Sequence, residues 1–320
     1  MIGTVTPNPA LDVTYELVGL DRGGDNRVAR VVTRAGGKGV NTAAVLVCLG
    51  DPVTALGPLG GQTGGELRRQ LELTGIYPRF TTIAGDTRRT VAIVETAGGA
   101  TTMLNEPGPA LSALEWAELR AEVARLAAEV SVLTMSGSLP TGVGVDAYAE
   151  LVGAARERSE CLVVVDTSGP ALPAAATARP DLMKPNAAEL AAVYPGVTPG
   201  DRPRRLLEAG AGAVAVSSGR DGLRLVTTEL DLTARLPEPL TGNPTGAGDA
   251  VVAAFAHELA AHGRQSLTDP VLADRAARYA VAVSAASVLA PVAGVVQQAD
   301  VDRMLARVTS GPTDPQGRAR

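Results

Sequence analysis

The sequence predicts a single α/β domain built around a mostly parallel β-sheet. Short apolar runs alternate with helical patterns along most of its 320 residues, which is the element order of such a sheet. Apolar residues make up 45% of the chain and charged residues 20%, as in globular rather than disordered proteins. A chain of this length buries a large core without disulfide or metal crosslinks.

The expected strands are short apolar runs, and the expected helices are longer segments with apolar residues at helical spacing. The strands are predicted at 3–6, 53–56, 132–135, 162–166, 182–184 and 213–217. The helices are predicted at 40–49, 65–73, 113–130, 146–156, 187–193, 202–209, 247–261 and 271–289. Their alternation is typical of consecutive β–α units.

Two segments, 12–34 and 87–105, interrupt this alternation. Both combine β-branched residues, polar alternation and glycine turns, so they are predicted to be hairpins inserted into the main domain. A small sheet made from both would cover a site as a lid. We expect one domain over residues 1–309 and a disordered tail over 310–320.

Charge and composition argue against several partners. The net charge is −5 and aromatic residues make up 2%, which does not suit a nucleic-acid binder. Residues 279–299 carry no charge, but they are rich in small residues and broken by Pro291, so we expect a buried helix and no membrane span. The N-terminus lacks a signal-peptide pattern, and Cys48 and Cys161 fit no metal spacing, as expected for a cytoplasmic protein with reduced thiols.

The chain has only two lysines, Lys38 and Lys184, among its 29 basic residues. Both lie in motifs marked by glycine or proline. Lysine supplies a compact charge with rotatable donors that arginine does not replace. We therefore expect both positions to bind anions, although an arginine bias in the gene would also leave few lysines.

Residues 245–250, TGAGDA, precede an alanine-rich helical run, which places two glycines at a helix N-terminus. The first N–H groups of a helix lack intrahelical partners and attract phosphate. Asp249 would project from the same turn, and a carboxylate base beside an anion site is what phosphoryl transfer to a hydroxyl requires. The alternative is a glycine-rich turn in which Asp249 only begins the helix.

Residues 36–41, GGKGVN, form a second glycine-rich turn before a helix. Their spacing is not that of a Walker A loop. The backbone could approach a sugar closely, with Lys38 on a phosphate and Asn41 on a hydroxyl. A tight strand-to-helix turn with a solvated lysine is the alternative.

Three further loops carry weaker signals. Residues 184–190, KPNAAEL, fit a variant capping box between Asn186 and Glu189, which leaves open a second role for Glu189 on a metal-bound water. The loop 136–140, SGSLP, follows a predicted strand and suits a polar substrate. The turn 216–222 could contact a nucleotide. For Arg27, Arg88 and Arg89 in the predicted lid segments, the simplest expectation is a charge exposed to solvent.

Other chemistries are missing from the sequence. There is no G-x-G-x-x-G fingerprint, which disfavours an NAD-dependent dehydrogenase, and no G-x-S-x-G elbow. The two histidines, His257 and His262, lie near the end of one helix and cannot build a triad or a zinc site.

Taken together, these motifs resemble the ribokinase-like carbohydrate kinase family. Residues 36–41 and 243–249 are similar to its two signatures, and the resemblance covers about residues 2–300. Segments 6–12, 136–140 and 184–186 are similar to its hexose-phosphate kinase branch, which holds 1-phosphofructokinases, tagatose-6-phosphate kinases and minor 6-phosphofructokinases. The resemblance implies a three-layer sandwich with a mostly parallel central sheet and a small β lid.

The resemblance also implies a role for each site residue, with Asp249 as the base that accepts the hydroxyl proton. The N–H groups that would stabilise the transferring phosphoryl group are those of Gly246, Ala247 and Gly248. The residues that would bind the phosphosugar are Asp12, Arg27, Gly37, Lys38, Asn41, Arg88 and Ser138. ATP would lie along Lys184, Asn186, Ser217 and Gly219, and Mg²⁺ would be held through water by Glu189 and Asp166.

The implied reaction is ATP- and Mg²⁺-dependent phosphorylation of a ketohexose phosphate. Fructose 1-phosphate is the first choice, with tagatose 6-phosphate and fructose 6-phosphate as alternatives, and a sensor of sugar phosphate or nucleotide without turnover is the alternative outside enzymes. The lid is expected to form a homodimer interface. Asn243 and Pro244 stand where many members carry Asp-Thr near a monovalent cation, which places potassium dependence in doubt.

Overall fold

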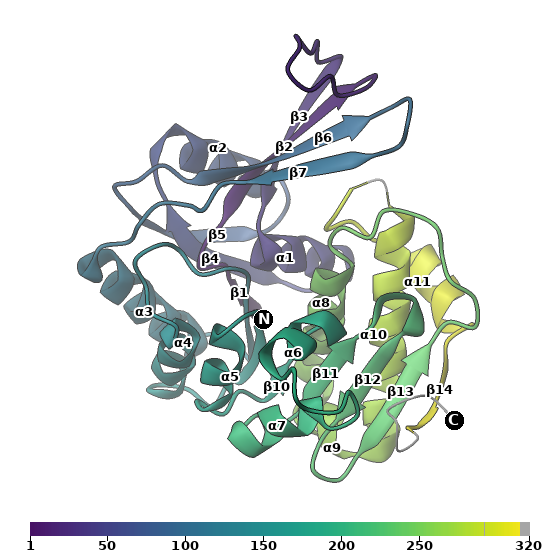
Figure 1. The fold of residues 1–320 in the computed structure, drawn as a ribbon. Coiled ribbons are helices and arrows are strands. Elements are labelled where there is room, and N and C mark those ends of the chain that lie inside the picture. The colour runs from purple at the N-terminus through teal and green to yellow at the C-terminus, as the bar shows by residue number, and fades with distance from the viewer. Residues whose placement is uncertain (291, 314–320) are drawn as a thin grey trace.

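The computed structural model describes residues 1–290 and 292–313 and confirms the predicted α/β class, with a large central sheet and a smaller one above it (Figure 1). The central sheet has the strand order β14-β13-β12-β11-β10-β9-β8-β1-β4-β5. Its strands are β1 Ile2–Val5, β4 Val53–Leu59, β5 Tyr77–Thr82, β8 Val132–Ser136, β9 Leu162–Asp166, β10 Leu182–Met183, β11 Val214–Ser217, β12 Leu223–Val226, β13 Asp231–Arg235 and β14 Thr309–Pro312. Neighbouring strands from β5 to β11 are parallel, and β12 to β14 extend the sheet in antiparallel order.

Helices cover both faces of this sheet, because alternate residues of the buried strands are apolar on both sides. In β9, Leu162 and Val164 enter one core, and Val163 and Val165 enter the other. The first core is closed by α1 Lys38–Cys48, α2 Gly61–Glu72, α8 Ala247–His262, α9 Gln265–Thr268, α10 Pro270–Leu289 and α11 Gln298–Leu305. The second is closed by α3 Ala113–Ala127, α4 Ala147–Arg156, α5 Ala171–Ala176, α6 Ala187–Val193 and α7 Arg202–Ala209.

The small sheet is the predicted lid. It has the order β3-β2-β6-β7, with β2 Ala10–Leu17, β3 Arg30–Gly36, β6 Arg88–Glu95 and β7 Thr101–Asn105. Each interrupting segment supplies one antiparallel pair, and the parallel pairing of β2 with β6 joins them. Figure 1 shows this sheet projecting from the body beside α1 and α2.

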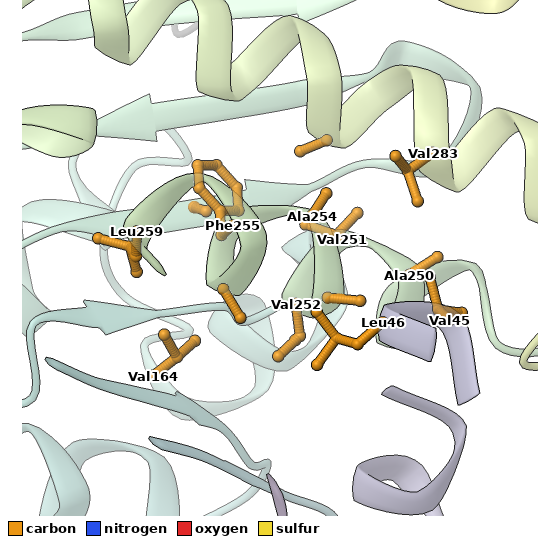
Figure 2. Close-up of a cluster of buried hydrophobic side chains, with 14 of the residues drawn as sticks. Val45, Leu46, Val164, Ala250, Val251, Val252, Ala254, Phe255, Leu259 and Val283 are labelled. Atoms are coloured by element: carbon orange, nitrogen blue, oxygen red, sulfur yellow. The ribbon is translucent and has the colours of Figure 1, made fainter. Parts of the chain in front are cut away.

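Helix α8 occupies the middle of the first core. Its alanine-rich sequence allows close packing, and Figure 2 shows its side chains among Leu46 of α1, Val164 of β9 and Val283 of α10. Phe255 fills the largest volume on this helix and is fully buried. Because α8 is fixed on several sides, its N-terminus is held rigidly at the edge of the sheet where strands β1, β8 and β9 end.

The structure corrects the expected tail. Residues 310–312 form β14 together with Thr309, paired with β13, so the prediction of disorder is wrong for them. Residues 314–320 of the predicted tail lie outside the described residues. None of the helices in the described chain combines the length and apolarity that a bilayer-spanning segment needs.

An ion pair ties α1 and α8 together at the end remote from their N-termini. His257 Nδ1 of α8 lies 2.8 Å from Asp51 Oδ2 in the loop after α1, and the imidazole also packs against Tyr279 of α10. The hydrogen bond to Asp51 raises the pKa of His257 against the opposing effect of burial, with Glu258 adding to the rise and Arg275 opposing it. This pair therefore stabilises the fold while the imidazole is charged.

We expect the contribution of this pair to be largest at low pH. A histidine whose pKa is raised in the folded state stabilises fully below its unfolded value and loses this contribution as pH rises through the folded value. His257→Leu should therefore lower the free energy of unfolding by about 1 kcal/mol at pH 6 and by less at pH 9. Urea unfolding at both pH values measures this. Asp51→Asn, which keeps the side-chain shape, should reproduce the trend, and an equal loss at both pH values in either variant would contradict it.

Candidate active site

The N-termini of α1 and α8 meet beside the carboxyl ends of β1, β8 and β9, where ligands bind in parallel α/β sheets. Asp249, in the first turn of α8, accepts a hydrogen bond from Asn41 Nδ2 of α1 at 2.9 Å. Gly246 is the N-cap of α8 with φ 82°, and a Cβ there would lie 2.7 Å from Ala293 Cβ. Only glycine fits this position, which brings Asp249 and its neighbours to the sheet edge.

Asp249 is 6% exposed, and its surroundings favour the protonated form more than water does. Burial, followed by the negative charge of Asp166, raises the pKa of Asp249 to about 7. The hydrogen bond from Asn41 and the charges of Lys38 and Lys184 oppose this rise. A carboxylate with a pKa near neutral pH is well matched to accept a proton from a hydroxyl.

The only two lysines of the chain meet on one carboxylate. Lys38 Nζ lies 3.3 Å and Lys184 Nζ 3.4 Å from Oδ1 of Asp166, whose side chain is fully buried. Burial is the largest single influence on Lys38 and works to lower its pKa, but the nearby carboxylates, Asp166 first, outweigh it and raise the pKa overall. The structure thus brings both predicted anion-binding lysines into one charged cluster with Asp166.

Lys184 faces the start of α8. A Cβ added at Gly248 would lie 3.5 Å from Lys184 Nζ, so the ammonium group stands next to the backbone of the first turn. The N–H of Ala247, one of the three expected phosphate donors, is bonded to Pro244 O at 3.2 Å. The N–H of Gly248 lies in the first turn and has no intrahelical acceptor. Lys184 and this N–H therefore face the same region.

A cavity of about 440 Å³ opens between the lid and the sheet edge. It is lined by Asn8, Lys38, Arg88, Asn105, Glu106, Pro107, Gly137, Ser138, Leu139 and Ser168. Three of these, Lys38, Arg88 and Ser138, are predicted phosphosugar residues. A pocket with two cations and several hydroxyl and amide groups suits a polar, negatively charged ligand.

Asn8 was not predicted as a site residue, although it holds this cavity together. Its Nδ2 lies 3.0 Å from Pro107 O, 3.2 Å from Ser138 Oγ and 3.3 Å from Leu139 O. The backbone carbonyl of Asn8 accepts from Arg88 Nε at 3.2 Å. The sequence feature that could have indicated a role for Asn8 is its position in segment 6–12. Sequence alone, however, does not show which loops its amide joins.

Asp12 lies on the inner face of the lid. Burial raises its pKa to about 6, against the positive charges of Arg34 and Arg88. A Cβ at Gly36 would fall 2.1 Å from its Oδ2, so the glycine of the paired strand makes room for the carboxylate. The second glycine, Gly37, has φ 102° and is the N-cap of α1, where a side chain would collide with Thr6.

A second cavity, of about 560 Å³, lies on the other side of the α8 N-terminus. Ser217 and Gly219, both predicted along ATP, line it together with Ala247 and Gly248, and its remaining wall is mainly apolar. Asn186 lies beside Ser217 through a β-bridge. The cavity can therefore hold an apolar ring at one end and present phosphate to the helix start at the other.

Arg27 and Glu189 are among the predicted residues that line neither cavity. Arg27 is in the exposed loop 18–29 between β2 and β3, at the tip of the lid in Figure 1, with α1 at the lid's base. Glu189 closes the capping box of α6, accepting from Asn186 N at 2.8 Å while Asn186 Oδ1 accepts from Glu189 N at 2.8 Å. The negative charge of Glu189 nevertheless contributes to raising the pKa of Lys38. A role for either residue at the site remains a prediction.

Asp166 and Glu189 are the residues predicted to hold Mg²⁺ through water. Among the described residues, no group of three or more His, Cys, Asp and Glu side chains is placed to hold a metal ion. Mg²⁺ in phosphoryl-transfer sites keeps several waters and binds one or two carboxylates together with substrate phosphates. A magnesium role for Asp166 and Glu189 remains a prediction, because in this structure Asp166 pairs with both lysines and Glu189 accepts from Asn186 N.

Comparison with known proteins agrees with this geometry. The family described as pfkB family carbohydrate kinase matches residues 5–298. A 1-phosphofructokinase of Rhodobacter capsulatus is 38% identical over 262 residues, covering 80% of this chain and 83% of that protein. A tagatose-6-phosphate kinase of Staphylococcus epidermidis is 34% identical over 269 residues, covering 81% and 85%. The crystal structure of phosphofructokinase-2 from Escherichia coli in complex with fructose-6-phosphate has a TM-score of 0.83 at 30% identity, covering 95% and 98%.

Proposed function

Because the chain belongs to the pfkB family of carbohydrate kinases, we propose that it transfers the γ-phosphoryl group of ATP to a hydroxyl of a ketohexose phosphate, with fructose 1-phosphate as the first substrate. The observation that carries this proposal is the connection between the two cavities. Gly248 of the apolar cavity adjoins Lys184, and Lys184 shares Asp166 with Lys38 of the lid cavity. Asp249 belongs to the same cluster.

The proposed mechanism assigns the proton to Asp249. Its carboxylate accepts the proton of the attacking sugar hydroxyl, and the N–H groups at the start of α8, with Lys184, stabilise charge on the transferring phosphoryl group. Asp12 and Asn41 are assigned to sugar hydroxyls. Asp166 and Glu189 would hold Mg²⁺ through water, and the ion would supply neutralisation of the phosphate charge when bound. The lid covers the phosphosugar and excludes water.

The substrate is tested by measuring ADP release with a panel of sugars. We expect the highest kcat/KM with fructose 1-phosphate, lower values with tagatose 6-phosphate and fructose 6-phosphate, and far lower values with unphosphorylated fructose. A higher value for one of the other two phosphates would reassign the substrate. ATP turnover with none of them, despite binding, would favour a sensor.

Arg88 is the clearest test of the phosphate pocket. It lines the lid cavity and is not in the Asp249 cluster, so it should bind the substrate phosphate equally in the ground and transition states. Arg88→Met should raise KM for the phosphosugar roughly 10- to 100-fold, the loss of one charged hydrogen-bond donor, with kcat and the KM for ATP little changed. The matched control is Arg89→Met, which alters an exposed neighbour on the other face of β6. Loss of ATP affinity alone in Arg88→Met would contradict the assignment.

We also propose that two copies pair through their lids. Apolar side chains remain exposed on one face of this sheet, including Val31 at 56% and Leu104 at 52%. Such a surface on a small four-stranded sheet suits burial against a second copy. Light scattering of the full chain measures the oligomeric state, and a monomer at micromolar concentration would oppose this proposal.

A further inference from the structure

Arg34 connects the lid to the catalytic cluster, although it carries no role in the proposed reaction so far. It lies on β3 directly opposite Asp12 in the β2–β3 register. Its side chain leaves the lid: Nη2 donates to Asn41 Oδ1 of α1 at 3.1 Å, and Nη1 donates to the carbonyl of Ala293. One guanidinium group therefore joins the lid strand to two other parts of the chain.

The contact with Asn41 fixes the direction of the amide group. A guanidinium only donates hydrogen bonds, whereas the two ends of an Asn amide are a donor and an acceptor. With Oδ1 held by Arg34, the Nδ2 end must face Asp249, to whose Oδ2 it donates at 2.9 Å. Without Arg34, the amide could turn and place its oxygen against the carboxylate, which would disfavour the ionised base.

The contact with Ala293 reaches the start of α8. Ala293 packs against Gly246, whose added Cβ would lie 2.7 Å away, and a Cβ at Gly294 would lie 3.0 Å from Arg34 Nη2. The guanidinium is thus enclosed between the lid, α1 and the 292–294 turn. The contacts of Arg34 with Asn41 and Ala293 would be lost if the lid strand moved away from the body.

We propose that Arg34 is a positioning residue through which the closed lid orients Asn41 and thereby holds Asp249 as an aligned, ionised proton acceptor. This inference rests on the proposed function, because it assumes that Asp249 is the base. It also gives the lid a second role, because Asp249 is held aligned and ionised only while the lid is in place. Chemistry would then be linked to lid closure, which limits transfer of the phosphoryl group to water.

The groups around Asp249 determine the direction in which its pKa should shift when Arg34 is removed. Asp166 of β9 raises the pKa of Asp249, whereas Lys38 of α1, Lys184 after β10 and the Asn41 amide lower it. Arg34 and Asp249 also attract one another directly. Removing Arg34 should therefore raise the pKa of Asp249 above its value of about 7, both by loss of charge and by release of the amide.

The experiment compares Arg34→Met with Arg30→Met in the full chain. Arg30 lies on the same face of β3 but has a side chain 68% exposed, so it is a matched control outside the site. Arg34→Met should lower kcat about 10-fold at pH 7 with KM for the phosphosugar within threefold, and it should move the acidic limb of the kcat profile to higher pH. Arg30→Met should leave kcat and the acidic limb unchanged. An unmoved acidic limb in Arg34→Met would overturn the inference.

A double-mutant cycle tests whether Arg34 acts through Asn41. In an Asn41→Leu background, adding Arg34→Met should lower kcat less than threefold, because the amide it would orient is gone. An undiminished 10-fold loss in that background would overturn the inference. If Asp249→Asn is inactive while Arg34→Met keeps a native acidic limb, only this inference fails. If Asp249→Asn turns over normally, the proposed function itself fails.

Discussion

Asp249→Asn will lower kcat at least ~100-fold, the low end of what a positioned base contributes, while KM for both substrates changes only a few-fold. The amide has the size of the carboxylate, so the contact with Asn41 and the first turn of α8 can persist. What disappears is the ability to accept the hydroxyl proton. Steady-state ADP release, measured at saturating substrates and at pH 8, gives the comparison.

A stability measurement separates this loss from misfolding. Because burial raises the pKa of Asp249 from 3.8 to about 7, the folded protein loses stability as the pH rises from 3.8 to about 7, and the full cost of ionising this carboxylate is present at pH 8. The neutral amide avoids that cost, so Asp249→Asn should be at least as stable as the native chain at pH 8. Asp146→Asn is the control: this exposed carboxylate at the start of α4 makes no capping hydrogen bond, and its loss should not affect kcat. Native turnover in Asp249→Asn would place the proton acceptor elsewhere.

The buried parallel strands could be predicted because they are continuous apolar runs, whereas the parallel edge strand β5, which is only partly buried, was missed. β9, with the sequence LVVVD, was predicted with its observed bounds. The antiparallel edge was missed because β12 and β13 are short, and because Arg224 interrupts the apolar run of β12 while Asp231 begins β13. These two side chains pair with each other in space. The tail was misjudged for a related reason, since β14 is recruited by the open edge of β13 and not by its own apolar pattern.

The candidate site could likewise be predicted from the sequence only in part. That Lys38 and Lys184 bind charged groups could be inferred from their rarity and their motifs, but that they meet on Asp166 is a consequence of tertiary structure. Arg34 gave no signal, because an arginine on a lid strand is most often solvated. Its importance lies in the direction of one amide, and no sequence pattern encodes that direction.

Lys184→Met should lower kcat on the order of 100-fold and also destabilise the fold. The ammonium group adjoins Gly248 at the start of α8, where a preorganised donor facing developing charge is worth 10²–10³-fold in kcat at an order-of-magnitude level. Its side chain is 4% exposed and that of Asp166 is fully buried, so its removal leaves a buried carboxylate with Lys38 as the remaining cation. Breaking a buried pair in this way costs roughly 3 kcal/mol.

The two effects of Lys184→Met can be separated by adding Asp166→Asn. Replacing both partners removes the unpaired buried charge, so the double variant should recover part of the lost unfolding free energy, measured in urea at pH 8. It should not recover kcat, because the donor facing the phosphoryl group and a carboxylate assigned to Mg²⁺ are both missing. Recovery of activity together with stability would mean that Lys184 only supports the fold, whereas native kcat in Lys184→Met would remove it from the site altogether.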